Sequence, residues 1–270
     1  MPTLLVTGGA GGVATALRPY LRDHYQLRLL DRQPIADLAA NESALIGDLT
    51  DPQLITRAVE GVDAILHLAC AHGTDISFQS TVEPNYHATL YLLEAAQRQG
   101  IKRFVFASSH HVLGQYRGDA ANYFDDLPVA PDSYYALSKV FGEAACTTFA
   151  LRSDLRTFVI RIGNADPQVA DARRLRMWTS SRDLAQLVRI GLEHDAVHHD
   201  IVYGVSESPQ PLFHNRHARA LGYQPEDNAG EHLSDAYLSY EAMPAQGSGR
   251  DHIGGAYAAA ALVSALGVQP

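Results

Sequence analysis

Features that mark whole classes of protein are scarce or absent in this sequence. It has only two cysteines, Cys70 and Cys146, which are too few for a disulfide scaffold and fit a reducing compartment. No apolar run approaches the roughly 18 residues that a membrane span needs, and the amino terminus lacks the basic start and cleavage site of a signal peptide. Acidic residues outnumber basic ones, and the net charge of −9 argues against nucleic-acid binding. We therefore expect a cytoplasmic protein without membrane or nucleic-acid partners.

The chain does have the size and apolar content of a protein with a substantial core. Its 270 residues, 46% of them hydrophobic, suffice for one large α/β domain with a small lobe. Strands alternate with helices up to Asn164, which predicts βαβ units and a parallel sheet covered on both faces. The expected strands are residues 3–7, 27–31, 44–48, 64–68, 104–108, 157–161 and 201–204, and the expected helices are 11–23, 54–59, 81–99, 133–151, 182–193 and 214–221.

A glycine-rich turn joins the first expected strand to the first helix. Glycines at this point permit a tight turn and let a pyrophosphate approach the backbone, and the start of the helix favours its negative charge. The spacing between Gly8 and Gly11 is three, where the commonest dinucleotide fingerprint has two. We expect Gly8, Gly11, Gly12 and Val13 to contact a dinucleotide cofactor.

An acid follows about 20 residues on, as this kind of site requires. Asp31 ends the second strand, where its carboxylate can accept from both ribose hydroxyls and would repel a 2′-phosphate. NAD is therefore favoured over NADP, although Arg32 could stack on adenine or soften that preference. Asp48 and Leu49 are expected to flank the adenine ring. Alternatively, Asp31 and Asp48 are simply turn residues.

Tyr135 and Lys139 lie four residues apart in the expected helix 133–151, and therefore on one face. An ammonium beside a phenol favours the phenolate, so we expect the pKa of Tyr135 to fall from about 10 toward neutrality. Such a tyrosine can take a proton from an alcohol. The alternative is an ordinary amphipathic helix face. Tyr134 is not the partner of Lys139, because it lies five residues away and therefore off the face of Lys139. Downstream of a glycine turn, the pair indicates a dehydrogenase.

These motifs together resemble the extended short-chain dehydrogenase/reductases, and within them the uronate dehydrogenases. The resemblance implies a Rossmann-type doubly wound parallel sheet over residues 1–165, which carries the cofactor and the catalytic triad, and a small carboxyl-terminal substrate-binding lobe over 166–270 integrated with the core. The superfamily resemblance rests on the glycine turn, Asp31, Asp48-Leu49, residues 67–69, Asn85, Ser108-Ser109 and the Tyr135–Lys139 step. The subfamily resemblance rests on residues 106–111, 138–143, 161–163, 173–178 and 221–229.

By resemblance, Ser109, Tyr135 and Lys139 form the catalytic triad. Tyr135 would take the proton of a substrate hydroxyl while hydride leaves the same carbon for C4 of the nicotinamide. Lys139 would hold the nicotinamide ribose, and Ser109 would fix the substrate oxygen unless it only satisfies the backbone at a strand end. The remaining implied cofactor contacts are Leu68, Ala69, Asn85 and Ile162. Asn85 has the alternative role of tying the backbone beside the site.

Arg173 is the residue that the resemblance assigns to a substrate carboxylate, because a guanidinium binds a carboxylate bidentately. Arg174 and Arg176 are alternatives, and a solvated basic loop is the plainer interpretation. The remaining implied substrate contacts are His72, Ser109, His110, His111 and Asn164.

At three of these positions the chain departs from the uronate group. His110 stands where an asparagine is usual, and Asn164 and His72 stand where serines are usual. Because all three would line the substrate pocket, the reaction type is better determined than the sugar. The part of the chain after Lys139 is short for a domain that holds a nucleotide, which favours a free sugar.

The function expected is NAD-dependent oxidation of the C1 hydroxyl of a cyclic acidic sugar, a hexuronate first, to the lactone. One alternative substrate is a sulfonated or phosphorylated hexose. Two rival functions are an epimerase or dehydratase that retains NAD, with Asp125 and Asp126 as weak candidate acids, and an NAD-sensing protein without catalysis. We expect a homo-oligomer from family habit. The histidine-rich run 194–200 falls at a helix end, where histidine suits the dipole, so we expect no metal.

Overall fold

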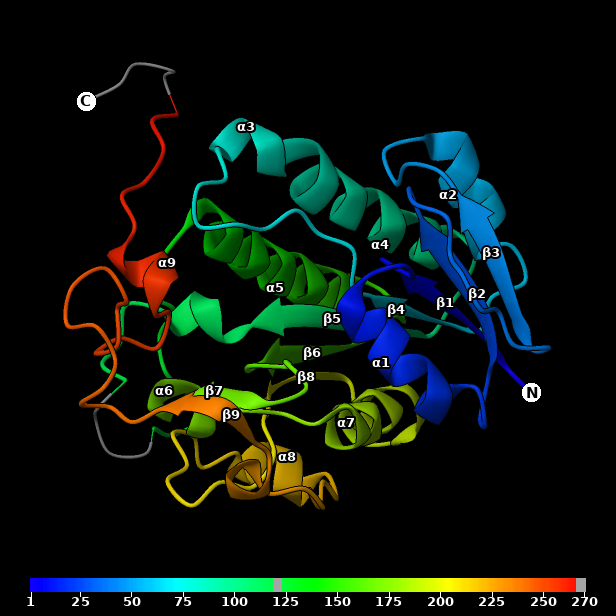
Figure 1. Cartoon of the computed structure of the whole chain (residues 1–270). Helices are drawn as coiled ribbons and strands as arrows, with labels where there is room; N and C mark the ends of the chain where they lie inside the picture. The colour runs from blue at the N-terminus through cyan, green and yellow to red at the C-terminus, as the bar shows by residue number, and fades with distance from the viewer. Residues whose placement is uncertain (119–122, 266–270) are drawn as a thin grey trace.

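The structure, a computed structural model, describes residues 1–118 and 123–265. Its centre is a seven-stranded sheet with the order β3-β2-β1-β4-β5-β6-β8, in which each neighbouring pair runs parallel (Figure 1). This confirms the expected doubly wound α/β fold. The strands of this sheet are β1 (Thr3–Thr7), β2 (Gln26–Asp31), β3 (Glu42–Ile46), β4 (Ala64–His67), β5 (Arg103–Ser109), β6 (Arg156–Ile162) and β8 (His199–Gly204).

Helices cover both faces of the sheet, because its central strands are apolar on both sides. The helices are α1 (Gly12–Leu21), α2 (Pro52–Val59), α3 (Phe78–Thr81), α4 (Ala88–Arg98), α5 (Tyr134–Arg152), α6 (Ala172–Leu175), α7 (Ser181–Glu193), α8 (Arg216–Ala220) and α9 (Ala256–Ala259). Leu17 of α1 and Leu187 of α7 belong to the core on one face. Leu54 of α2, Leu92 of α4 and Cys146 of α5 belong to the core on the other. No helix in the described part of the chain is long and apolar enough to cross a membrane.

The order of the strands creates the site. β1 pairs with β2 on one side and with β4 on the other, so the winding direction of the sheet reverses at β1. The loops that leave β1 and β4 diverge at this point, which opens a crevice outside the carboxyl ends of the strands. The first glycine turn, the end of β2 and the end of β5 all lie at that edge.

The expected helix 81–99 is not one regular helix. It begins as α3, continues as a π-helical segment over Val82–His87, and becomes α-helical again in α4. Pro84 lies inside the π-helical segment, where a proline has no backbone N–H to donate to an α-helical hydrogen bond. Such wide turns occur frequently at functional sites, and this one places Asn85 beside the loop that follows β4.

The segment after residue 165 is joined to the main sheet. α7 and β8 complete the core described above, while β7 (Val169–Asp171) and β9 (Leu233–Leu238) form a separate two-stranded parallel sheet below it (Figure 1). The carboxyl-terminal tail contains α9 (Figure 1). The division at residue 165 into two functional parts stays a prediction.

Candidate active site

A cavity of about 730 Å³ lies at the carboxyl ends of the main strands. Its walls come from the ends of β1, β2, β4, β5 and β6, from α5, and from the tail. The predicted site residues that line it are Gly8, Gly11, Gly12, Val13, Asp31, Arg32, Asp48, Leu49, Leu68, Ala69, His72, Ser109, His110, His111, Tyr135, Lys139, Ile162 and Asn164. Asn85 and Arg173 lie outside this lining.

The glycine turn brings two strand ends into contact. Gly8 has a φ of 73°, and a Cβ added to it would lie 2.8 Å from the backbone nitrogen of Ala69. Only glycine fits there without strain. Gly11 precedes α1 without a side-chain cap, and an added Cβ at Gly12 would meet nothing within 4 Å. The first N–H groups of α1 therefore face the cavity uncapped, which suits a phosphate anion.

Asp31 at the end of β2 and Asp48 just after β3 are held by backbone amides. Asp31 accepts from Ala10 N at 3.1 Å and from Gln33 N at 2.9 Å, so its carboxylate is fixed at the cavity wall. Asp48 accepts from the backbone nitrogen of Thr50 and pairs with Arg32 at 3.8 Å on the surface. An exposed ion pair of this kind contributes little stability, so Arg32 remains available to a ligand.

The Tyr135–Lys139 pair sits in the first turns of α5. Ser133 caps this helix by accepting from Ala136 N, which places Tyr135 over the end of β5. Nζ of Lys139 is buried, donates to the carbonyl of Ala107 at 2.7 Å, and lies 5.6 Å from the Tyr135 ring centroid. The helix can approach β5 closely because it has glycine at position 142. A Cβ there would lie 2.1 Å from the Phe106 ring.

The pKa of Tyr135 departs from expectation. Burial holds it well above the usual value for a phenol, the neighbouring Cys70 adds to the rise, and a hydrogen bond with Ser109 acts against it. The hydrogen bond of the Lys139 ammonium goes to a backbone carbonyl, as described above. The expected lowering is therefore wrong for this arrangement, because the cost of burying a phenolate outweighs the lowering that the Ser109 hydrogen bond supplies.

Histidines crowd the end of the cavity next to Tyr135. The rings of His72 and His111 lie 6.0 and 5.8 Å from the Tyr135 ring, both edge-on. Nδ1 of His110 donates to the carbonyl of Ile162 at 3.0 Å, and burial, followed by His111 and Arg173, holds the pKa of His110 well below its usual value. His110 is therefore neutral, with its second nitrogen free to accept a hydrogen bond.

Two predicted residues act on the cavity from behind its wall. Oδ1 of Asn85 accepts a hydrogen bond from Ala71 N, and its Nδ2 donates to Ala71 O and Ser138 Oγ. Asn85 therefore connects the loop after β4 to the helix that carries Tyr135. Its direct contact with the cofactor stays a prediction. Nη1 of Arg173 donates to the carbonyl of Ile253 at 2.7 Å, and the charge of Arg173 contributes to the lowered pKa of His110. The role of Arg173 in substrate binding stays a prediction.

Tyr257 is a cavity residue that the sequence did not reveal. It lines the cavity from α9, with its ring 4.2 Å from that of His111 and 6.1 Å from that of Tyr135. No sequence motif marks the tail around α9, and contacts with residues distant in sequence place it beside the cavity. Cys70 is a second such residue, since it is partly exposed and lines the cavity.

Sequence similarity to known proteins identifies the family of this chain. A model of the "NAD dependent epimerase/dehydratase family" matches residues 4–165. A uronate dehydrogenase of Pseudomonas putida is 39% identical over 259 residues, which cover 95% of this chain and 96% of that protein.

The chain belongs to the NAD-dependent epimerase/dehydratase family. An NAD-dependent glucose-6-phosphate dehydrogenase of Haloferax volcanii is also similar, 32% identical over 84% of this chain and 94% of that protein. The crystal structure of uronate dehydrogenase from Agrobacterium tumefaciens has a TM-score of 0.87 at 30% identity, covering 96% of this chain and 97% of that one. The resemblance inferred from the motifs is thereby confirmed.

The residues of this family member fit NAD, the cofactor of the family. At Gly8, close to Ala69, the turn presents backbone without a side chain to the cofactor, and the uncapped start of α1 suits the pyrophosphate. The fixed carboxylate of Asp31 suits ribose hydroxyls and disfavours a 2′-phosphate. Lys139 and Tyr135 line the same cavity as the glycine turn, and their contact with the nicotinamide ribose stays a prediction.

Replacing Asp31 with asparagine is expected to lower the preference for NAD over NADP. The ratio of the two binding constants should fall about ten- to a hundredfold, the range for a hydrogen bond to a charged group. Titration of the protein with each cofactor measures this ratio. Asp51→Asn, at the cap of α2 outside the cavity lining, is the matched control. An unchanged ratio in Asp31→Asn would contradict the role assigned to this carboxylate.

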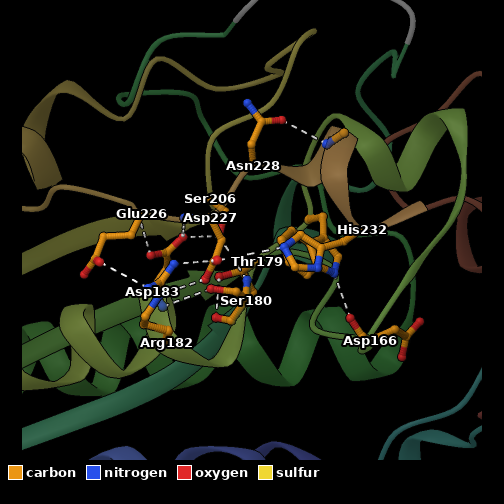
Figure 2. Close-up of polar contacts among 12 residues, drawn as sticks. Asp166, Thr179, Ser180, Arg182, Asp183, Ser206, Glu226, Asp227, Asn228 and His232 are labelled. Carbon is orange, nitrogen blue, oxygen red and sulfur yellow. Dashed lines mark hydrogen bonds and ion pairs between the residues drawn. The ribbon is translucent and has the colours of Figure 1, made fainter. Parts of the chain in front are cut away.

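A buried carboxylate fixes the start of α7, where Ser181 lines the cavity. Figure 2 shows Asp183 at the centre of a set of contacts with the loop that carries Glu226 and Asp227. Asp183 is fully buried and accepts from Ser206 Oγ, Glu226 N and Asp227 N at 2.5, 2.8 and 3.2 Å. These bonds join the carboxyl-terminal segment to the wall of the cavity.

Proposed function

We propose that this protein is an NAD-dependent dehydrogenase that oxidises the C1 hydroxyl of a cyclic hexuronate to the corresponding lactone. The observation that carries the proposal is the gathering of Ser109, Tyr135 and Lys139 at one end of a cavity whose opposite end fits NAD. The similarity to uronate dehydrogenases over nearly the whole chain supports the choice of substrate.

Each catalytic side chain has a separate task in the proposed reaction. The phenolate oxygen of Tyr135 takes the proton of the C1 hydroxyl, and the carbonyl forms as hydride leaves C1. The acceptor of that hydride would be supplied by C4 of the nicotinamide when NAD is bound. Ser109 holds the substrate oxygen, and Lys139 is the proposed ligand of the nicotinamide ribose.

The substrate end offers partners for a sugar. Nδ2 of Asn164 donates to Asp166, and its buried Oδ1 has no partner among the described residues, so it can accept from a sugar hydroxyl. His72, His110 and His111 supply further acceptors on the cavity wall. For the carboxylate we propose Arg173, whose guanidinium keeps donors beyond the one bound to Ile253.

A second substrate class is a hexose phosphorylated or sulfonated at C6. The similarity to a glucose-6-phosphate dehydrogenase favours it, and a guanidinium binds phosphate as readily as carboxylate. A dehydratase that retains NAD is less well supported, because its candidate acids do not line the cavity. Asp125 accepts from the backbone nitrogen of His217, and neither Asp125 nor Asp126 is part of the cavity lining.

A substrate panel with NAD tests the proposal. We expect NADH to form with glucuronate or galacturonate at least as fast as with glucose 6-phosphate or a C6-sulfonated hexose. Turnover of the phosphate or sulfonate without turnover of either uronate would overturn the uronate assignment. Tightly bound NAD in the purified protein, with no net NADH from any sugar, would instead indicate an epimerase or dehydratase.

The raised pKa of Tyr135 predicts the pH dependence of the reaction. The proton acceptor is the phenolate, and a pKa above the usual value makes this form scarce at neutral pH. Consequently kcat/KM for the sugar should rise from neutral to alkaline pH, in proportion to the phenolate fraction. A pH–rate profile measures this, and a profile that falls over the same interval would contradict it.

A further inference from the structure

Asp132, which no sequence motif marked, occupies a narrow cradle behind the catalytic tyrosine. Its side chain is completely buried. A Cβ added to Gly114 or to Gly254 would lie within 2 Å of Asp132 Oδ2, at 1.9 and 1.8 Å respectively. Both glycines are therefore required for space, since any side chain would overlap the carboxylate. The backbone of Gly254 also donates to the carbonyl of Gly114 at 2.9 Å, which closes the cradle.

The carboxylate in this cradle fixes one nitrogen of His111. Nδ1 of His111 lies 2.7 Å from Asp132 Oδ2, while Ser133 Oγ donates to the second carboxylate oxygen at 2.8 Å. A carboxylate can only accept, so Nδ1 carries the proton. The partner of one imidazole nitrogen decides which tautomer the neutral ring adopts. In the neutral ring with Nδ1 protonated, Nε2 is an acceptor.

The free nitrogen of His111 faces the reaction site. His111 lines the cavity, and the nitrogen opposite Asp132 has no hydrogen-bond partner among the described residues. This nitrogen is not buried, so it is open to the cavity. The imidazole stands between Tyr135 and Tyr257, which restrict its rotation.

We propose that Asp132 is a positioning residue that holds His111 in the Nδ1–H form, so that Nε2 accepts a hydrogen bond from a substrate hydroxyl close to the one that Tyr135 deprotonates. The inference rests on the proposed dehydrogenase function and adds a means by which the site recognises a second hydroxyl of the substrate. The ligand class is a polyol in which a second hydroxyl lies near the oxidised one. A substrate with the oxidised hydroxyl alone leaves this acceptor unpaired.

The tautomer can be measured without any turnover. Nitrogen-15 NMR of histidine-labelled protein, assigned with His111→Gln, should show His111 protonated at Nδ1. In Asp132→Asn, which fills the same cradle, the amide can also donate to Nδ1, and the Nε2–H form should appear. Finding the Nε2–H form in the unmodified protein would overturn the proposal, whether or not the protein proves to be a dehydrogenase.

Kinetics with glucuronate and NAD test how Asp132 acts. Asp132→Asn and His111→Gln should each lower kcat/KM about tenfold, the value of one hydrogen bond to substrate. The double variant should lose no more than His111→Gln alone, because Asp132 acts through that imidazole. Losses that multiply would show an independent role and would overturn the proposal. Asp154→Asn, an exposed aspartate paired with Lys102, should leave kcat/KM unchanged.

Discussion

Replacing Tyr135 with phenylalanine is expected to lower kcat by about two to four orders of magnitude, the range for a proton transfer by a positioned side chain. The substitution removes only the phenolic oxygen, so the ring keeps its edge-on contacts with His72 and His111. NAD affinity and thermal stability should change little. Steady-state NADH formation with glucuronate, a cofactor titration and thermal unfolding measure the three quantities.

The neighbouring tyrosine provides the matched control. The Tyr134 ring lies 5.8 Å from that of Phe78, and Tyr134 does not line the cavity. Tyr134→Phe should therefore retain nearly the full kcat. Equal losses in the two variants, or a Tyr135→Phe enzyme that keeps most of its kcat, would remove Tyr135 from the reaction.

Removing the carboxylate of Glu143 is expected to cost about 3–5 kcal/mol in the free energy of unfolding, as for buried ion pairs in general that lose one partner. Glu143 binds Arg161 through two bonds of 3.0 and 2.9 Å, and Ser108 Oγ donates to it at 2.6 Å. Both charged side chains are only 6% exposed. In Glu143→Ala the guanidinium of Arg161 would stay buried without its carboxylate partner, on the strand next to the one that ends at Ser109.

Denaturant unfolding of a set of variants separates charge burial from packing. Glu143→Ala should show the full loss, whereas the double variant Glu143→Leu with Arg161→Met should recover most of it because no charge is left buried. A double variant as unstable as Glu143→Ala would mean that lost packing causes the instability. Glu94→Ala, from an exposed pair with Arg98, should change the free energy of unfolding by less than about 1 kcal/mol.

The sequence predicted the main sheet because local signals agree with the fold there. Apolar runs such as 104–108 have the length and composition of buried strands, and the glycine turn after residue 7 reflects a backbone constraint visible in Gly8 itself. The expected strands all occur, with ends that differ by a few residues. Most predicted site residues line one cavity because they sit at the ends of these parallel strands, where topology alone brings them together.

Features set by distant contacts escaped prediction. Tyr257 reaches the cavity because the tail docks through Ile253 N to Tyr116 O and Gly254 N to Gly114 O. Gly254 of the same tail also packs against Asp132, the partner of His111. Burial, which the spacing of Tyr135 and Lys139 could not show, reverses the expected direction of the Tyr135 pKa. The π-helical turn around Asn85 likewise reflects contacts with Ala71 and Ser138 beyond its own helix.

Transfer of deuterium from C1 of the sugar tests the central claim most directly. Glucuronate labelled with deuterium at C1 is incubated with NAD and the protein, and the NADH and sugar products are analysed by NMR and mass spectrometry. The proposed reaction predicts that the label appears at C4 of the nicotinamide and that an unlabelled lactone or its hydrolysis product forms. Label that stays on the sugar, or unlabelled NADH, would contradict the assignment of this site to hydride removal at C1.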